Sequence, residues 1–212
     1  MRTIHKGNEP ACVTELRSSG GGFGGLSGAC KAEVRRALAK EQRHLCCYCL
    51  SRIEPDDARM KVEHWLPQSD PEQGKQGELA WDNLFGACRG GEGSPPSMQH
   101  CDTRKGDQYL SLRPTDPTCG ERIRYLPDGT VRSDDKELQV ELDQVLNLNL
   151  KRLQRNREAT LDGFLDAAKR SSDKNWTRAR IERWLDELAE PERLQEHVQI
   201  VVHFLERRLA RS

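Results

Sequence analysis

Apolar residues recur at helical spacing in several parts of the chain. One helix is predicted over residues 29–44, and longer helical segments over residues 136–165, with a break near residues 147–149. Two further helices are predicted over residues 178–188 and 194–209, which a proline separates. Such stripes are typical of helices that bury one face in a core.

Extended segments are short and few. Residues 60–62 alternate as a strand would, and Pro67 ends this segment. Residues 123–126 and 130–132 flank Pro127-Asp128-Gly129, a turn signal, so a hairpin is predicted there. The fold class is therefore α+β and mainly helical.

The amino-terminal part carries little pattern. Residues 1–17 are expected to pack as an arm on the main body, without an element of their own. Six of the eleven residues 18–28 are glycine, which predicts a flexible segment, called here the glycine-rich loop. It lacks the Lys-Ser/Thr ending of a phosphate-binding loop, which speaks against that function.

Composition divides the chain near residue 133, where Gly, Pro and Cys give way to Leu, Glu and Arg. We expect three parts: an arm, loop and helix over residues 1–44, a central unit with the following hairpin over 45–132, and a helical subdomain over 133–212.

Charge excludes a globally basic nucleic-acid binder. The 212 residues include 34 Lys plus Arg and 34 Asp plus Glu, so only local patches could contact phosphate. The acid-free run 151–157 is one candidate, although such runs are usually solvated helix faces. Residues 1–7 show no apolar signal region, and no apolar run reaches membrane-spanning length. We expect a soluble cytoplasmic protein with reduced thiols and no membrane partner.

Cysteine spacing points to a structural zinc ion. A Cys-x-x-Cys knuckle presents two thiolates to one tetrahedral Zn²⁺, and a second pair must close the site. Two later cysteines can do so, if the Gly- and Pro-rich segment between them forms a loop; the predicted ligands are Cys46, Cys49, Cys88 and Cys101. The remaining cysteines are expected to be buried apolar thiols: Cys12, Cys30, Cys47 and Cys119.

Acid, imidazole and amide groups lie between and beside these pairs. Glu63 and His64 follow the predicted strand, Asn83 comes later, and Asp102 is adjacent to a zinc cysteine. This order resembles the HNH, or ββα-metal, nuclease family over about residues 45–107.

The resemblance implies a role for each of these residues. His64 would be the general base, and Glu63 and Asp102 would hold one catalytic Mg²⁺ or Mn²⁺. Asn83 would order the loop after His64, and Lys105 would touch the substrate phosphate, with a solvated side chain as the alternative.

One ligand stays open in this interpretation. Many family members carry His or Asn where this chain has Asp102, and they keep the second cysteine pair close, so His100 competes with Asp102 as the metal ligand.

Motifs outside the central unit resemble PtuB-like HNH nucleases of Septu and retron anti-phage systems. They include Glu41-Gln42 before the knuckle, the unit His100-Cys101-Asp102-x-x-Lys105-Gly106, and Leu146-Asn147-Leu148-Asn149. The resemblance implies an endonuclease subunit that acts on DNA, or alternatively RNA, with a PtuA-like ATPase and in some systems a retron RNA/DNA complex.

Two other functions compete with a nuclease. A four-cysteine zinc site is commonly only structural, so the chain could be a non-catalytic zinc-stapled protein-interaction module. A redox Cys-x-x-Cys protein is a poor fit, because the βαβ context of such proteins is absent.

Overall fold

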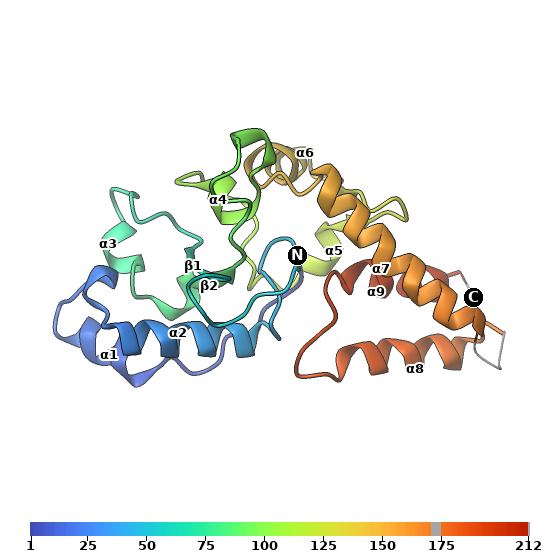
Figure 1. The fold of residues 1–212 in the computed structure, drawn as a ribbon, viewed down its shortest axis with the longest axis horizontal. Coiled ribbons are helices and arrows are strands. Elements are labelled where there is room, and N and C mark those ends of the chain that lie inside the picture. The colour runs from blue at the N-terminus through green and yellow to red at the C-terminus, as the bar shows by residue number, and fades with distance from the viewer. Residues whose placement is uncertain (171–174, 212) are drawn as a thin grey trace.

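A computed structural model describes residues 1–170 and 175–211 and shows a helix-rich α+β fold (Figure 1). The helices are α1 (Ala11–Ser18), α2 (Gly28–Glu41), α3 (Gly74–Gly77), α4 (Cys101–Lys105), α5 (Cys119–Arg122), α6 (Lys136–Val140), α7 (Lys151–Arg170), α8 (Arg178–Ala189) and α9 (Gln199–Leu209). The strands are β1 (Lys61–His64), β2 (Leu84–Ala87), β3 (Arg124–Tyr125) and β4 (Val131–Arg132). Short 3₁₀ turns are η1 (Phe23–Gly25), η2 (Trp81–Asn83) and η3 (Pro96–Met98), and η4 (Glu141–Val145) is a π-helical turn.

The central sheet is the antiparallel pair β1–β2, with His64 opposite Leu84 and Lys61 opposite Ala87. Helix α2 packs against β2, and Gln42 at its end donates from Nε2 to the Gly86 carbonyl at 2.8 Å. A Cβ atom on Gly86 would lie 2.6 Å from Met60 Cε, so a larger residue there would force the buried Met60 side chain to move. The sheet and α2 form the platform of the site.

Helix α2 confirms the helix predicted over residues 29–44. Ser27 caps its start by accepting a hydrogen bond from the Cys30 backbone N–H at 3.1 Å. Val34 and Leu38 are fully buried on the face toward the sheet. The charged faces point away from the core, as the spacing predicted.

The predicted hairpin is confirmed by the pairing of β3 with β4. Gly129 adopts a φ of +77°, and a Cβ atom there would lie 2.0 Å from the Gln154 carbonyl oxygen. Arg157 lies across this turn, donating from Nε to the Gly129 carbonyl at 2.6 Å. Arg157 is 1% exposed, so the prediction of a wholly solvated basic run is wrong at this residue.

The break predicted near residues 147–149 is confirmed and positions part of the site. Helix α6 passes into η4, and Asn147 then takes a φ of +49° before α7 begins. The Leu146 carbonyl accepts a hydrogen bond from the Cys101 backbone N–H at 2.9 Å. The break between η4 and α7 thus holds the start of α4 through this hydrogen bond.

Helices α7, α8 and α9 lie together at the opposite end of the molecule from α1, α2 and α3 (Figure 1). The segment before α9 nevertheless contacts the central unit, since His197 N donates to the Leu50 carbonyl at 2.9 Å. Helix α9 starts at Gln199, later than predicted, because His197 adopts a φ of +55° that a helix does not accept.

Two expectations about the amino-terminal part are corrected. Residues 11–18 form α1, a helix that their weak pattern did not indicate. Cys12 and Cys30 form a disulfide between α1 and α2, so the expectation that every thiol is reduced is wrong for this pair. Met1 and Ile4 are buried, as expected of an arm that packs on the body.

The helices in the described part of the chain were compared with the requirements of a membrane span. None of them combines the necessary length and apolar character.

Candidate metal and catalytic site

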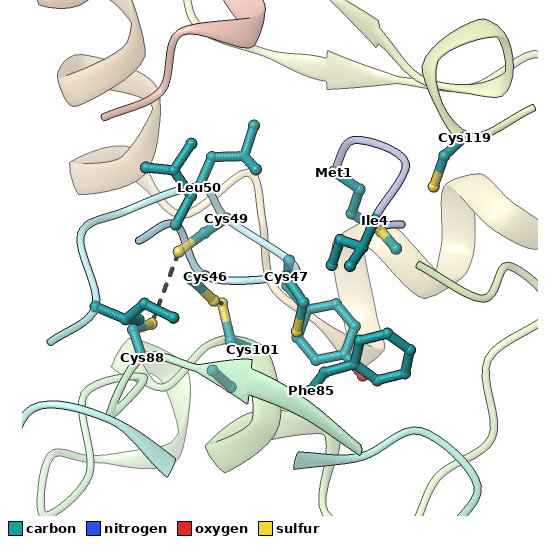
Figure 2. Packing of buried hydrophobic residues seen from close by; sticks show 14 of the residues in the cluster. Met1, Ile4, Cys46, Cys47, Cys49, Leu50, Phe85, Cys88, Cys101 and Cys119 are labelled. Atoms are coloured by element: carbon teal, nitrogen blue, oxygen red, sulfur yellow. Dashed lines mark hydrogen bonds between the residues drawn. The ribbon is translucent and has the colours of Figure 1, made fainter. Parts of the chain in front are cut away.

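Four buried cysteines from three segments of the chain meet in the core (Figure 2). Their sulfurs lie within 4.8 Å of one another, with Cys46 Sγ 3.9 Å from Cys101 Sγ and Cys49 Sγ 3.7 Å from Cys88 Sγ. A tetrahedral zinc ion with Zn–S bonds of about 2.3 Å separates its ligand sulfurs by about 3.8 Å. The predicted four-cysteine set is therefore brought together at distances that suit zinc.

Local backbone geometry sets up the cluster. The knuckle closes through Leu50 N, which donates to the Cys46 carbonyl at 3.2 Å. The neighbouring Cys101 thiol lowers the pKa of Cys49 to about 5 by hydrogen bonding, while burial raises the pKa of Cys101 well above its usual range. A divalent cation would resolve this competition, because it holds its cysteine ligands as thiolates.

The other cysteines lie outside the cluster. The Cys47 side chain points away from it toward Phe85, and Cys119 lies apart near Met1 (Figure 2). Both are free and buried, as predicted. Cys12 and Cys30 are not free thiols, because they form the disulfide described above.

Glu63 lies on β1 and is 2% exposed. Its Oε1 accepts a hydrogen bond from Tyr48 Oη at 2.6 Å and pairs with Lys105 Nζ at 2.9 Å. Burial, followed by the nearby Asp102 carboxyl group, raises the pKa of Glu63 well above its usual range. The buried Glu63 carboxyl group of β1 therefore lies next to the Asp102 carboxyl group of α4.

His64 follows on the same strand and is 9% exposed. Its Nε2 lies 3.0 Å from the Glu78 carbonyl oxygen, so Nε2 carries the proton and donates it. The Phe23 ring meets the imidazole edge-on, with ring centroids 4.7 Å apart. Burial lowers the pKa of His64 and favours the neutral imidazole.

Asp102, on α4, is partly exposed and lies 3.3 Å from Lys61 Nζ. Its competitor His100 turns elsewhere: Nδ1 lies 3.2 Å from Cys101 Sγ, and Nε2 accepts from Arg152 at 3.0 Å. His100 therefore belongs with the cysteine cluster, and Asp102 is the residue placed beside Glu63.

Lys105 is 1% exposed. Besides its ion pair with Glu63, its Nζ donates to the His64 carbonyl at 3.0 Å. The alternative of a solvated side chain is therefore wrong. The ammonium group points toward Glu63 and the His64 carbonyl. The contact of Lys105 with a substrate phosphate therefore stays a prediction.

Asn83 ties the segment after His64 to the end of the loop that follows. Its Oδ1 accepts from Leu66 N at 2.7 Å, while Nδ2 donates to the carbonyls of Leu66 at 3.2 Å and Gly77 at 3.0 Å. Asn83 lies close to Gly77, since a Cβ atom at this glycine would be only 3.2 Å from Asn83 Nδ2. One buried amide thus satisfies three backbone groups.

We predict that Asn83→Ala lowers the free energy of unfolding by about 2–3 kcal/mol, because three partly buried backbone groups lose their partner. Urea denaturation measures this, and hydrogen exchange is expected to accelerate in residues 66–77. The exposed Asn8→Ala is the matched control, expected within about 0.5 kcal/mol of wild type. Equal stability of the two variants would contradict the role of Asn83.

The Glu63–Asp102 pair suits a hard cation. Both partners of Glu63 bind Oε1, which leaves Oε2 for Asp102 or for an ion. In the described part of the chain, no third His, Cys, Asp or Glu completes a group around them. Mg²⁺ commonly binds through one or two carboxylates with water and substrate phosphate as its other ligands.

Several neighbours of the site escaped sequence reasoning. Tyr48 lies inside the knuckle, and Phe23 and Glu78 come from loops far along the chain. Glu78 contacts His64 through its backbone carbonyl, so no residue type could have signalled it. The aromatic residue inside the knuckle was the one available hint.

Together these features describe a helix-rich protein with a zinc-suited cysteine cluster beside a buried acid-histidine pair. No family model matches the chain. Over 142 residues it is 27% identical to a protein of Vibrio cholerae serotype O1 biovar El Tor named "Retron Vc95 putative HNH endonuclease". The alignment covers 64% of this chain and 66% of that protein, so the chain spans about two thirds of its relative. The similarity supports a relationship to HNH nucleases.

Proposed function

We propose that the chain is a metal-dependent HNH endonuclease that hydrolyses phosphodiester bonds of nucleic acid. The observation that carries the proposal is the placement of neutral His64 beside the facing carboxyl groups of Glu63 and Asp102. The order β1, β2 and α4, held by the cysteine cluster, supports a ββα-metal core.

His64 is the general base in this proposal. Its Nε2–H is fixed on the Glu78 carbonyl, so the second ring nitrogen, Nδ1, holds the lone pair. Nδ1 makes no hydrogen bond with any residue that the structure describes, which leaves it able to take a proton from the attacking water. The lowered pKa keeps that lone pair available at neutral pH.

Glu63 and Asp102 would hold Mg²⁺ or Mn²⁺. The ion would neutralise charge that develops on the phosphate oxygens during hydrolysis. Tyr48 and Lys105 fix the Glu63 carboxylate through its Oε1 atom. His100 orients the structural cysteine cluster through its contact with Cys101. Glu63 and Cys101 are thus held by buried neighbours.

A substrate panel tests the function. The purified chain, alone and co-expressed with its partner, would be incubated with DNA and RNA in Mg²⁺, in Mn²⁺ and without either ion. Cleavage that depends on the ion supports the proposal and identifies the substrate. Wild type that behaves like His64→Ala under all these conditions would refute it.

The relative is named as a retron protein, which supports a retron context for this chain. The anti-phage role beside a PtuA-like ATPase is proposed from the resemblance of the sequence motifs alone. The balanced charge fits a subunit that depends on others to bring its target. We place the docking site for the ATPase on the carboxy-terminal helices.

A cavity of about 520 Å³ between β3, α7 and α9 supports that placement. Its wall includes Trp176 and Phe204, and among the residues that the structure describes its charged lining is Arg207, Arg208 and Arg211. Aromatic walls with a basic rim suit an acidic partner segment that carries an apolar anchor. Truncation after Arg132 is a poor test, because it also removes the contact of His197 with Leu50.

We predict that Arg207→Glu with Arg211→Glu weakens co-purification with the ATPase at least about tenfold, because reversed charges repel the acidic segment. Both arginines are exposed, so the fold should persist. Arg36→Glu, on the exposed face of α2, is the control and should co-purify normally. Unchanged binding of the double variant would exclude this docking site.

One observation favours the alternative of a non-catalytic zinc-stapled interaction module. The buried Lys105 forms an ion pair with Glu63, and a buried carboxylate with a purely structural role requires such a partner. Binding of Mn²⁺ to wild type that is lost in Asp102→Asn would exclude the alternative, and absence of both binding and cleavage would favour it.

A further inference from the structure

The glycine-rich loop lies over the proposed general base. Its residue Phe23, in η1, packs edge-on against the His64 ring at 4.7 Å. The Phe23 backbone N–H donates to Glu78 Oε2 at 2.6 Å, and the Glu78 carbonyl accepts from His64. The loop and the imidazole are thus joined twice, directly and through Glu78.

Close approach accounts for two of the loop glycines, and backbone conformation for a third. A Cβ atom on Gly22 would lie 2.6 Å from Glu78 Oε2, and one on Gly21 would lie 2.3 Å from Leu16 Cδ1. Gly20 adopts a φ of +79°, a conformation that glycine takes without strain. The loop is therefore shaped to bring Phe23 to His64, which the expectation of a merely flexible segment did not include.

The disulfide Cys12–Cys30 closes the loop at its base. Cys12 lies on α1 before the loop and Cys30 in the first turn of α2 after it. A surface cavity of about 300 Å³ is lined by both cysteines together with Leu16 and Leu26, so a small dithiol can reach the bond. The disulfide holds together α1 and α2, the helices on either side of the glycine-rich loop.

We infer that Phe23 is a positioning residue for His64, and that the Cys12–Cys30 disulfide holds the glycine-rich loop in the arrangement that keeps the imidazole ready for catalysis. This inference rests on the proposed function. A dithiol breaks the S–S bond by giving two electrons and two protons to form two thiols, and is itself oxidised to a disulfide. Reduction therefore loosens the loop and makes the nuclease less active.

The effect falls on the chemical step, because Phe23 touches the base. Phe23→Ala is expected to lower kcat on the order of tenfold, with KM within about twofold, since small displacements of a catalytic group have large effects on rate. Phe23→Tyr keeps the ring and should restore kcat. Phe164→Ala, in the separate aromatic cluster of α7 and α8, controls for the general loss of an aromatic side chain and should keep kcat.

The redox arm compares wild type with the Cys12→Ser/Cys30→Ser double variant, each with and without dithiothreitol. Reduction should lower the wild-type kcat about threefold, less than Phe23→Ala because the Glu78 contacts persist. The double variant should match reduced wild type and show no response. A response in the double variant would place the effect at other cysteines and overturn the redox part.

Nuclear magnetic resonance of ¹⁵N-labelled histidine follows the His64 ring directly. The signals that His64→Ala removes should shift in Phe23→Ala and on reduction of wild type. Unchanged kcat and unchanged signals in Phe23→Ala would overturn the inference. If no preparation cleaves nucleic acid, the proposed function fails, and the His64 signals alone then decide whether the loop positions the ring.

Discussion

Replacing His64 with alanine is expected to lower nucleic-acid cleavage by about 10²–10⁴-fold, the usual contribution of a positioned general base. The reason is local: the neutral ring, fixed on the Glu78 carbonyl at 3.0 Å, is the group whose free nitrogen can accept the proton of water. Single-turnover cleavage at saturating Mg²⁺ measures the effect on the chemical step.

The fold should survive this change. His64 contributes no sulfur to the cysteine cluster, so the zinc content of the variant should equal that of wild type. His5→Ala, at an exposed position of the arm, is the control and should cleave normally. Full activity of a folded, zinc-loaded His64→Ala protein would remove the histidine from the mechanism.

Cys101→Ser is expected to abolish stoichiometric zinc binding and to destabilise the protein by about 3–5 kcal/mol, or roughly 6–20 °C in Tm. Cys101 is fully buried between Cys46 and His100, and it also starts α4, which carries Asp102 and Lys105. Loss of the cluster therefore disturbs the carboxylate pair, and cleavage should fall with zinc content.

Cys119→Ser makes the same chemical change at another fully buried thiol that lies outside the cluster. This control variant should retain about one zinc ion per chain, and its Tm should fall only slightly. Metal analysis after gel filtration and calorimetry provide the two measurements. Equal zinc content in both variants would show that Cys101 is not a ligand.

Much of the cysteine cluster was predictable from sequence spacing. A Cys-x-x-Cys knuckle limits its own geometry, so Cys46 and Cys49 needed only a second pair. The choice between Asp102 and His100 was not predictable, because the directions of two side chains so close in sequence are known only once the backbone is placed. Cys101, which lies between these two residues, adopts a φ of +56°. With the backbone in this conformation, Asp102 lies beside Glu63.

Lys105 and Arg157 show the same limit for charged residues. Each lies in a polar stretch typical of a solvated surface, and each is 1% exposed. Their burial depends on distant acceptors, Glu63 for Lys105 and the Gly129 turn for Arg157. A sequence pattern describes only residues that are neighbours along the chain. It therefore does not reveal hydrogen-bond partners that are distant in sequence.

By itself, the sequence determined the helical segments of α2 and of α6 to α9, the β3–β4 hairpin and the cysteines of the knuckle, because periodicity and spacing act over a few residues. It did not indicate α1. Tertiary structure alone decided that Phe23 covers His64, that Cys12 meets Cys30, and that Asp102 faces Glu63. Each of these pairs joins residues at least 18 positions apart, whose meeting depends on how α1, α2, β1 and α4 pack.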